Sequence, residues 1–474
     1  MKKHLVILGK KANSWAFGVE QAGRLLRDGV KPLILSFEEN KSNHSPRMKY
    51  LLEVLNLNEA DIFCSNQLVT KTDIKNDIKI GKLWLKELSK NRDWVNCELF
   101  GLPMGRILMS NFARVAGTRN FKLDLIPFSY QLEVVSLALL ANSAYDKLKF
   151  EFDEITIPNG RSPIESVMLF RSREQEKKIH VTERGSDKSK IAFYKTSPHF
   201  APDWWNDLEK FTLRDLNDNS KTIENYWSLR LQGIDELSGK NWSKSQAKKT
   251  SGKFQKDNTI AFFCTSEHEV PVIAEFETSN LGYSSQQAAV RDIVKACKTL
   301  NLHLIIKRHP NSLAANGIDR ESTDWDWVKS KSDITYLDAR DETDSYELLK
   351  EVSANLVFKS SIGVEATAME LPSRALGPAK WAYSTESRID NYDNLVKFLR
   401  NPSRLPSEIS DRWGLMLSTF GEKLIYFKEI HGGYAMLEDG SKIFSADTYS
   451  SLSNKLIRKF RGKFLMLALG LKKK

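Results

Sequence analysis

The chain has 474 residues, 41% of them hydrophobic and 28% charged, which is ordinary for a water-soluble globular protein and enough for two or three domains. Its four cysteines are scattered without CxxC spacing, which argues against a disulfide framework or a zinc cluster and favours a reducing, cytoplasmic location. No run of about 18 apolar residues is present, so no transmembrane helix is expected, and the net charge of +11 indicates attraction to polyanions without choosing among nucleic acid, anionic lipid and phosphorylated substrates.

The first residues predict one strand–helix–strand unit of a parallel α/β sheet. The expected elements are a strand at 4–8, a polar loop at 9–17, a helix at 18–28 and a strand at 31–37. Because the apolar run of the first strand is short and Gly9 with two lysines follows it at once, a buried strand is favoured over a signal peptide. The loop lacks a GxGxxG pattern, so no dinucleotide fingerprint is expected.

Helical patterning dominates from about residue 45 to 125 and again in a strong run at 129–149. A second α/β unit follows. It comprises a strand at 152–157, the turn Asn159-Gly160-Arg161, a helix at 163–176, a strand at 179–182 that ends at Glu183-Arg184-Gly185, and an aromatic-rich helical stretch at 203–237.

The clearest boundary is the segment 238–258, which is rich in Lys and Ser and cannot bury a core. After it the α/β pattern resumes, with strands at 260–264, 302–306, 334–337 and 355–358 and helices at 286–299, 345–352 and 364–370. Two α/β halves joined by a basic linker predict two facing Rossmann-like domains with a cleft between them. The expected division is an N-terminal domain at 1–237, the linker at 238–258, a C-terminal domain at 259–425 and an extension at 426–474.

Two buried strands of the C-terminal half stop abruptly at polar residues, as expected where a parallel sheet delivers side chains to a ligand crevice. The first leads into Lys307-Arg308-His309-Pro310, whose cations and imidazole suit a phosphate or pyrophosphate. The second leads through Ser360-Ser361-Ile362-Gly363 into a helix, where hydroxyls, backbone N–H groups and the positive helix end face a ligand. A structural histidine and a simple serine N-cap are the alternatives. Glu365 lies in the first helical turn, where a carboxylate is stabilised in any case; its functional interpretation is a hydrogen bond to ribose.

Together these segments resemble bacterial GT-B glycosyltransferases of the capsular polysaccharide type, a group that includes the Kdo transferases, and the His-Pro and Ser-Ser motifs of bacterial sialyltransferases. The segment Asp344–Leu349 looks like the "D-T-Y-x-L-L" element of the same group, and Phe263–Glu269, with Ser266, looks like its strand end "TSS-x-x-E". The resemblance implies that the cytidine monophosphate part of a CMP-sugar is bound by Lys307, Arg308, His309, Pro310, Ser360, Ser361, Gly363, Glu365 and Ser266.

The N-terminal half carries weaker similarities, so the resemblance spans roughly residues 150 to 400. Asn159-Gly160-Arg161, Glu183-Arg184-Gly185 and Ser197-Pro198-His199 resemble "NGR", "ERG" and "PH" elements of capsule-type transferases. The chain departs from the family at Glu370-Leu371-Pro372-Ser373, where Gly-Lys-Pro is usual, and this puts the subfamily in doubt.

The resemblance implies a metal-independent enzyme without a cofactor, which moves a sugar from a nucleotide donor to a cell-surface glycan or lipid-linked acceptor. The imidazole of His309, when protonated, can stabilise or protonate the leaving phosphate. The motifs alone identify no clear acidic base; Glu183 is the candidate to deprotonate the acceptor hydroxyl, because its carboxylate ends a strand that is expected to face the cleft. Its position resembles the acidic-acidic-Gly motif that supplies the base in sialyltransferases, although Arg184 replaces the second acid. Arg161, Arg184 and His199 are candidates to grip a phosphate or carboxylate. A salt-bridged surface role for Glu183, and packing roles for Arg161 and His199, remain open. The letters of Asp324-Trp325-Asp326 fit a DxD metal motif, but the stretch is expected to be exposed.

Two other functions remain open at this stage. The nearest is a teichoic-acid-type transferase that uses a CDP-polyol and has a similar Lys-x-His-Pro element. The second is a non-catalytic nucleotide- or glycan-binding protein of the same fold. A nucleic-acid binder is not expected, because no RNP, zinc-finger or helix-turn-helix signature is present.

The segment 454–474 alternates basic and apolar residues and contains no acid. This pattern predicts an interfacial helix on an anionic leaflet, and thus a peripheral location on the inner face of the cytoplasmic membrane. A C-terminal helix packed on the protein body is the alternative.

Overall fold

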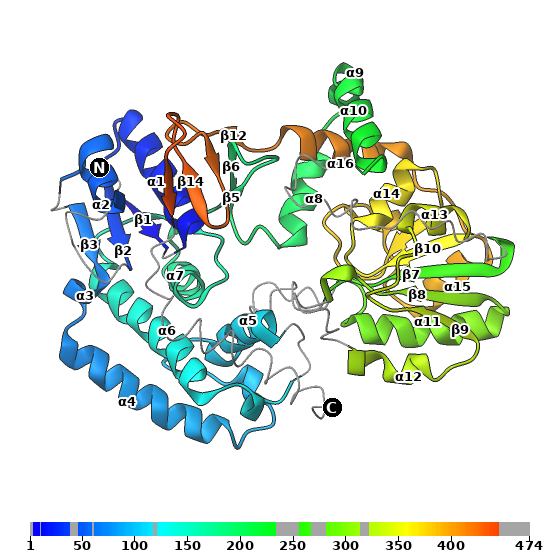
Figure 1. Cartoon of the computed structure of the whole chain (residues 1–474), viewed down its shortest axis with the longest axis horizontal. Coiled ribbons are helices and arrows are strands. Elements are labelled where there is room, and N and C mark those ends of the chain that lie inside the picture. The colour runs from blue at the N-terminus through cyan, green and yellow to red at the C-terminus, as the bar shows by residue number, and fades with distance from the viewer. Residues whose placement is uncertain are drawn as a thin grey trace. The chain divides into compact units, whose positions relative to one another are not determined.

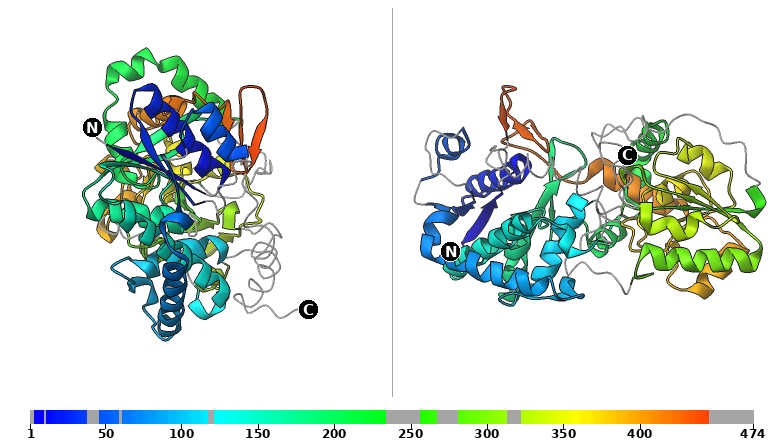
Figure 2. Two further views of the ribbon diagram at one scale, coloured as in Figure 1. Left: turned by 90° about the vertical axis from the view of Figure 1, so that its left-hand side faces the viewer. Right: turned by 60° about the horizontal axis from the view of Figure 1, so that its bottom comes forward.

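The computed structural model describes residues 3–9, 11–37, 46–58, 61–116, 121–233, 256–266, 281–312 and 322–444. The chain separates into two compact units (Figure 1). Unit 1 holds the described residues up to Pro198 and those from Gly421 onward, and unit 2 holds those from His199 to Phe420. Helices lie against the sheet in each unit (Figure 2). Among the described residues, no helix has both the length and the apolar character that crossing a membrane requires.

Unit 1 is built on a seven-stranded sheet in the order β12-β6-β5-β4-β1-β2-β3. The five strands β1 to β5 run parallel, and β6 and β12 add antiparallel neighbours at one edge. The order reverses between β1 and β4, which makes the carboxyl ends of these two strands a topological switch point. The strands are β1 (His4–Leu8), β2 (Pro32–Ser36), β3 (Ile62–Cys64), β4 (Glu154–Pro158), β5 (Lys178–Arg184), β6 (Lys190–Tyr194) and β12 (Glu422–Lys423).

The helices of unit 1 are α1 (Ala12–Arg27), α2 (Pro46–Lys49), α3 (Ser65–Leu68), α4 (Lys71–Leu88), α5 (Met104–Ala116), α6 (Phe128–Leu148) and α7 (Pro163–Glu174). The polar loop expected at 9–17 is wrong, because α1 begins at Ala12. Trp15 and Phe17 lie within that stretch and are buried in the core beside Val6 and Leu8. The burial of these two aromatic side chains explains why the helix starts so soon after β1.

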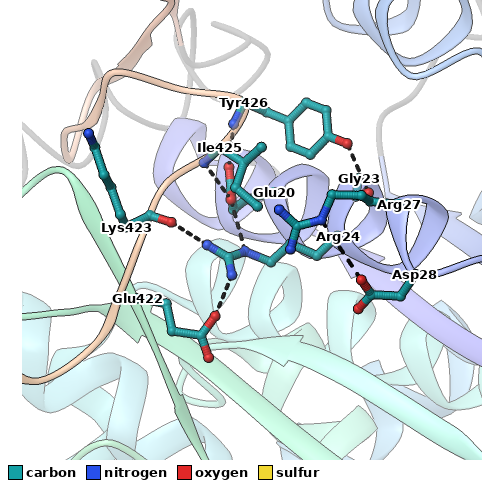
Figure 3. Close-up of polar contacts among 9 residues, drawn as sticks. All are labelled: Glu20, Gly23, Arg24, Arg27, Asp28, Glu422, Lys423, Ile425 and Tyr426. Atoms are coloured by element: carbon teal, nitrogen blue, oxygen red, sulfur yellow. Dashed lines mark hydrogen bonds and ion pairs between the residues drawn. The ribbon is translucent and has the colours of Figure 1, made fainter.

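The C-terminal part of unit 1 is fastened to α1 by a buried carboxylate (Figure 3). Glu20 is fully buried, and its side chain accepts hydrogen bonds from the backbone N–H groups of Ile425 and Tyr426, each at 2.9 Å. Arg24 donates to Glu20 at 2.9 Å and also pairs with Glu422. We call this arrangement the Glu20 clasp. Beyond it lies a small antiparallel sheet of β13 (Glu429–Ile430), β14 (Tyr434–Met436) and β15 (Lys442–Phe444).

Unit 2 is built on a five-stranded, fully parallel sheet in the order β11-β10-β7-β8-β9. This order matches that of the five parallel strands of unit 1, and it reverses between β7 and β10. The prediction of two Rossmann-like α/β halves is therefore confirmed. The strands are β7 (Thr259–Phe263), β8 (His303–Lys307), β9 (Ile334–Leu337), β10 (Ala354–Val357) and β11 (Ser373–Ala375).

Three helices that precede the predicted linker belong to unit 2, so the division of the chain differs from the expected boundary at residue 237. The indole of Trp227 donates to the carbonyl of Ser410 at 3.3 Å, and the ring of Trp204 lies 5.7 Å from that of Trp413. These aromatic contacts join α8 and α10 to α16. The helices of unit 2 are α8 (Ala201–Glu209), α9 (Leu213–Asp218), α10 (Ser220–Leu231), α11 (Gln286–Leu300), α12 (Asp326–Lys329), α13 (Ser345–Lys350), α14 (Ile362–Ala368), α15 (Tyr392–Arg400) and α16 (Ser407–Thr419).

The predicted cleft between facing halves stays a prediction. The helix expected at 454–474 and most of the linker at 238–258 lie outside the described residues.

Candidate nucleotide site in unit 2

The carboxyl ends of β7 and β10, which flank the switch point of unit 2, are joined by side-chain hydrogen bonds. The backbone N–H of Lys359, after β10, donates to the hydroxyl of Thr265, after β7, at 3.0 Å. The side-chain amide of Gln286, at the start of α11, accepts from the N–H of Thr265 at 2.6 Å and donates to its carbonyl at 3.1 Å. The edge where α/β sheets bind ligands is thus held in one arrangement.

His309 lies at this edge with a defined hydrogen-bonding pattern. Its Nδ1 accepts from the backbone N–H of Asn311 at 3.0 Å and lies 3.3 Å from the hydroxyl of buried Ser266. Pro310 opens the short 3-10 turn Pro310–Ser312 that contains the N–H of Asn311. Since a backbone N–H can only donate, Nδ1 carries no proton, and a neutral His309 holds its proton on Nε2. The structure therefore brings His309 and Ser266 together, and their role in nucleotide binding stays a prediction.

Lys307 is a buried cation at the end of β8, with 5% of its surface exposed. Within the described part of the chain its ammonium makes no hydrogen bond or ion pair. Burial lowers the pKa of Lys307, and the carboxylates of Asp341 and Asp344 offset only part of this effect. Burying an ammonium without a close partner is costly. An anionic ligand at this edge would relieve that cost.

Arg308 points elsewhere. It is 1% exposed, and its guanidinium donates to the hydroxyl of Tyr336 at 2.9 Å and to that of Ser312 at 3.0 Å. The guanidinium also lies 5.1 Å from the ring centroid of Trp325. Trp325 is itself 1% exposed, so the expectation that 324–326 forms an exposed stretch is wrong at its centre. The contacts give Arg308 a role in the core of unit 2; its predicted role in donor binding stays a prediction.

The Ser-Ser turn begins α14 without the expected capping bond. The hydroxyl of Ser361 donates to Glu365 at 3.1 Å, while that of Ser360 accepts from the N–H of Ile362 at 3.4 Å. Gly363 allows α14 to pack closely, because a Cβ there would lie 2.4 Å from a ring carbon of Trp381. A packing requirement therefore accounts for the glycine in this motif.

Glu365 is 4% exposed, and both of its carboxylate oxygens have partners. Oε1 accepts from Nε and Nη2 of Arg230 at 3.1 and 2.8 Å, and Oε2 accepts from the hydroxyl of Tyr346 at 3.0 Å. Burial, and then the carboxylate, raise the pKa of Tyr346. The ribose contact proposed for Glu365 stays a prediction. Sequence reasoning missed Arg230, which is 135 residues away in the chain, whereas Tyr346 lies in the quoted Asp344–Leu349 segment.

The candidate base Glu183 lies in unit 1, near the carboxyl end of β5. Its carboxylate accepts from the side-chain amide of Asn159 and, at 3.0 Å, from the backbone N–H of Arg184. Asn159 and Gly160 both adopt left-handed backbone conformations, with φ of 57° and 73°. This turn aims the Asn159 amide at β5, which explains the Asn-Gly pair before Arg161.

A second carboxylate, missed from the sequence, lies at the switch point of unit 1. Glu165, in the first turn of α7, is 5% exposed. A Cβ on Gly9, just after β1, would lie 2.9 Å from its Oε1, so the glycine makes room for this side chain. The local sequence signal for this residue is limited to a helix that begins at Pro163 and has an acid in its first turn. His199 is assigned to unit 2 and Arg161 to unit 1, so the predicted phosphate candidates are divided between the units.

One group of possible metal ligands occurs among the described residues, at the amino ends of β1, β4 and β5. Oε2 of Glu154 lies 3.7 Å from Nδ1 of His4 and 3.2 Å from Nε2 of His180. The ammonium of Lys178 also donates to Oε2, at 3.0 Å. Because this ammonium occupies the shared oxygen, we interpret the group as a charge network. The absence of a metal cofactor stays a prediction.

The sequence matches no family model and no curated protein. Among solved structures, the β-Kdo 2,4 transferase KpsC of Thermosulfurimonas dismutans is similar at 12% identity and a TM-score of 0.38, over 55% of this chain and 78% of that one. The UDP-GlcNAc 2-epimerase of Methanocaldococcus jannaschii is similar at 11% identity and a TM-score of 0.28, over 88% and 99%. The glycosyltransferase SsfS6 of Streptomyces sp. SF2575 is similar at 8% identity and a TM-score of 0.21, over 89% and 97%. Likenesses this distant carry no argument about chemistry.

Proposed function

We propose that the chain is a GT-B-type glycosyltransferase that moves a sugar from a nucleotide donor, of the CMP-linked kind, to a surface glycan or lipid-linked acceptor. Unit 2 binds the nucleotide at the carboxyl edge of its parallel sheet, and unit 1 presents the acceptor. The proposal rests on the residues of the edge, since the fold alone is compatible with many activities.

The observation that carries the proposal is the buried ammonium of Lys307. In the described part of the chain it forms no hydrogen bond or ion pair, and the carboxylates of Asp341 and Asp344 offset only part of the effect of its burial. It stands one strand away from the switch point. A buried ammonium that lowers stability is expected at a position where a bound ligand supplies the negative counter-charge. A phosphate ester is the ligand that an ammonium and an imidazole N–H suit best.

In the proposed reaction, the bond between the anomeric carbon and the phosphate oxygen breaks while the acceptor oxygen bonds to that carbon. Lys307 stabilises the charge that develops on the leaving phosphate. His309, with Nδ1 held by the N–H of Asn311, donates from Nε2 to the same phosphate. The acceptor hydroxyl gives its proton to a carboxylate of unit 1, for which Glu183 is our candidate. The amide of Asn159 orients that carboxylate.

Nucleotide binding is tested by thermal melting of the full chain with CMP, CDP, UMP, UDP and GDP. A nucleotide at about 100 times its Kd should raise the free energy of unfolding by about 2.7 kcal/mol. We expect the cytidine nucleotides to stabilise the chain most. Stabilisation by UDP alone would overturn the CMP-linked donor, and stabilisation by none of the five would overturn the nucleotide site.

Lys307→Met separates a ligand site from a structural lysine. If the ammonium serves a phosphate, the variant melts at a higher temperature than the wild type without ligand and loses the nucleotide-dependent shift. Lys350→Met, on an exposed lysine of α13, is the matched control and should change neither quantity. A destabilised Lys307→Met variant that keeps the nucleotide shift would refute the assignment.

Catalysis is tested by CMP release in a donor and acceptor screen. His309→Ala should lower kcat about a hundredfold or more, as should Glu183→Gln. Glu165→Gln is the comparison that identifies the base, because Glu165 is a second acid at the carboxyl edge of unit 1 among the residues that the structure describes. If CMP were released only when a CDP-polyol is the donor, the proposed sugar transfer would be wrong and the activity would be polyol-phosphate transfer. Unchanged turnover in the His309 and Glu183 variants would exclude both residues from the chemistry.

A further inference from the structure

Helix α4 of unit 1 carries a row of lysines along one side. The opposite side of the helix packs against α6 (Figure 1). Gly81 is buried there, and a Cβ on it would lie 2.9 Å from a methyl of Val135. The carboxylate of Asp77 accepts from the hydroxyl of Ser143 at 2.9 Å. One face of α4 is therefore committed to the protein, and the other is presented to the surroundings.

The outward face holds five exposed lysines, which we call the α4 lysine row: Lys71, Lys75, Lys79, Lys82 and Lys86. Their spacing of three or four residues places them within one sector of the helix. The row extends over about 22 Å, given a rise of 1.5 Å per residue. Leu83, which is 57% exposed, lies beside this sector, and Ile80, which is 37% exposed, lies further round the helix on the same side.

The row does not stabilise the helix that bears it. No acid stands three or four residues before or after any of the five lysines, and within the described part of the chain none of them forms an ion pair. Lysines four residues apart, such as Lys71 and Lys75, repel each other. The helix is instead secured by the capping box of Thr70 and Asp73 and by its contacts with α6. Because these lysines do not stabilise the helix, we look for an anionic partner of the α4 lysine row outside the chain.

We propose that the α4 lysine row docks unit 1 on a membrane surface rich in anionic lipid headgroups. Lysine ammonium groups are compact and strongly hydrated, so they suit a diffuse layer of headgroup charge rather than the bidentate contacts that arginine makes. The exposed Leu83, beside the row, can enter the boundary between headgroups and acyl chains. Single-stranded nucleic acid is the other polyanion, but the outward face offers no aromatic ring on which a base could stack.

The test is sedimentation of the full chain with vesicles of phosphatidylcholine, with and without phosphatidylglycerol. We expect binding only to the anionic vesicles, and weaker binding as salt is raised. Each well-placed lysine contributes about fivefold, so Lys75→Gln/Lys79→Gln/Lys82→Gln should lower the partition coefficient about a hundredfold. Leu83→Ser should lower it by a smaller factor that salt does not change.

A matched triple variant removes the same charge elsewhere: Lys195→Gln/Lys221→Gln/Lys331→Gln, all on exposed lysines. It should bind anionic vesicles nearly as the wild type does. An equal loss in both triple variants would assign binding to net charge and overturn the proposal. So would unchanged binding in the α4 variant, which would assign it to another surface such as 454–474. RNA binding of the same variants is measured in parallel. If the α4 variant lost RNA binding but kept vesicle binding, the membrane proposal would also be overturned. The nucleotide-dependent melting shift should be the same in all these variants, so failure here is distinct from failure of the proposed function.

Discussion

Removing Arg230 should destabilise unit 2 strongly, because it would strand the buried charge of Glu365. The two side chains pair at 2.8 Å, and the carboxyl side chain is 5% exposed while the guanidinium side chain is 23% exposed. Breaking a buried pair by deleting one partner costs about 3–5 kcal/mol, because the remaining charge loses its compensation. Here Tyr346 and Ser361 still donate to the carboxylate, so we expect Arg230→Met to cost about 3 kcal/mol.

The measurement is urea unfolding of the full chain, followed by tryptophan fluorescence, with each transition fitted separately because the chain has two units. Glu365→Gln alone should cost less, since the amide retains one acceptor. In the double variant Arg230→Met/Glu365→Gln no charge is stranded, so much of the stability lost in Arg230→Met should return. A cost below about 1 kcal/mol for Arg230→Met, or an additive double variant, would refute this account of the pair.

Three further outcomes follow from buried groups of unit 1 and from the α14 turn. The pKa of His4 is lowered from 6.5 to about 4, mainly by burial, so between these pH values the unfolded chain binds a proton at this residue and the folded chain does not. The free energy of unfolding should therefore fall by about 3 kcal/mol as the pH drops from 6.5 to about 4, and His4→Gln should lose this part of the pH dependence. Glu20→Gln should cost about 3 kcal/mol in urea unfolding, whereas Glu422→Gln, whose side chain is 64% exposed, should cost little; equal costs would contradict the clasp. Gly363→Ala should cost about 1–3 kcal/mol because its methyl would overlap an indole ring, while Gly432→Ala, with open space around it, should be neutral; a neutral Gly363→Ala would show that the helix can shift.

Much of the fold could be predicted because the strands of a buried parallel sheet appear in the sequence as short runs of apolar residues. β1 and β9 have the predicted bounds, and β7, β8 and β10 differ from prediction by one residue at each end. The polar residues at the strand ends can also be recognised in the sequence, and the structure places two of them, Ser266 and His309, in contact. These features are local, so a window of ten residues contains them.

What could not be predicted depends on contacts between distant parts of the chain. Arg308 looked like a phosphate ligand, but its partners on β9 and in the turn after β8 draw it into the core. The sequence places Glu365 in the first turn of a helix but does not identify its partner Arg230, which reaches it from α10. The assignment of α8–α10 to unit 2 follows from aromatic side chains that meet only in the folded chain. Periodicity gives the direction of a side chain on its own element and says nothing about its partner.

The Glu20 clasp also bears on the order in which the chain is synthesised. Glu20 is translated 405 residues before Ile425, whose backbone N–H donates to its carboxylate, and Tyr426, the second donor, follows directly. The segment that forms most of unit 2 is translated between them. Unit 2 therefore has its described elements before unit 1 receives β12 and the strands after it. Until β12 has been translated, β6 is the edge strand on that side of the sheet of unit 1, and the carboxylate of Glu20 lacks the two N–H donors that it has in the folded chain.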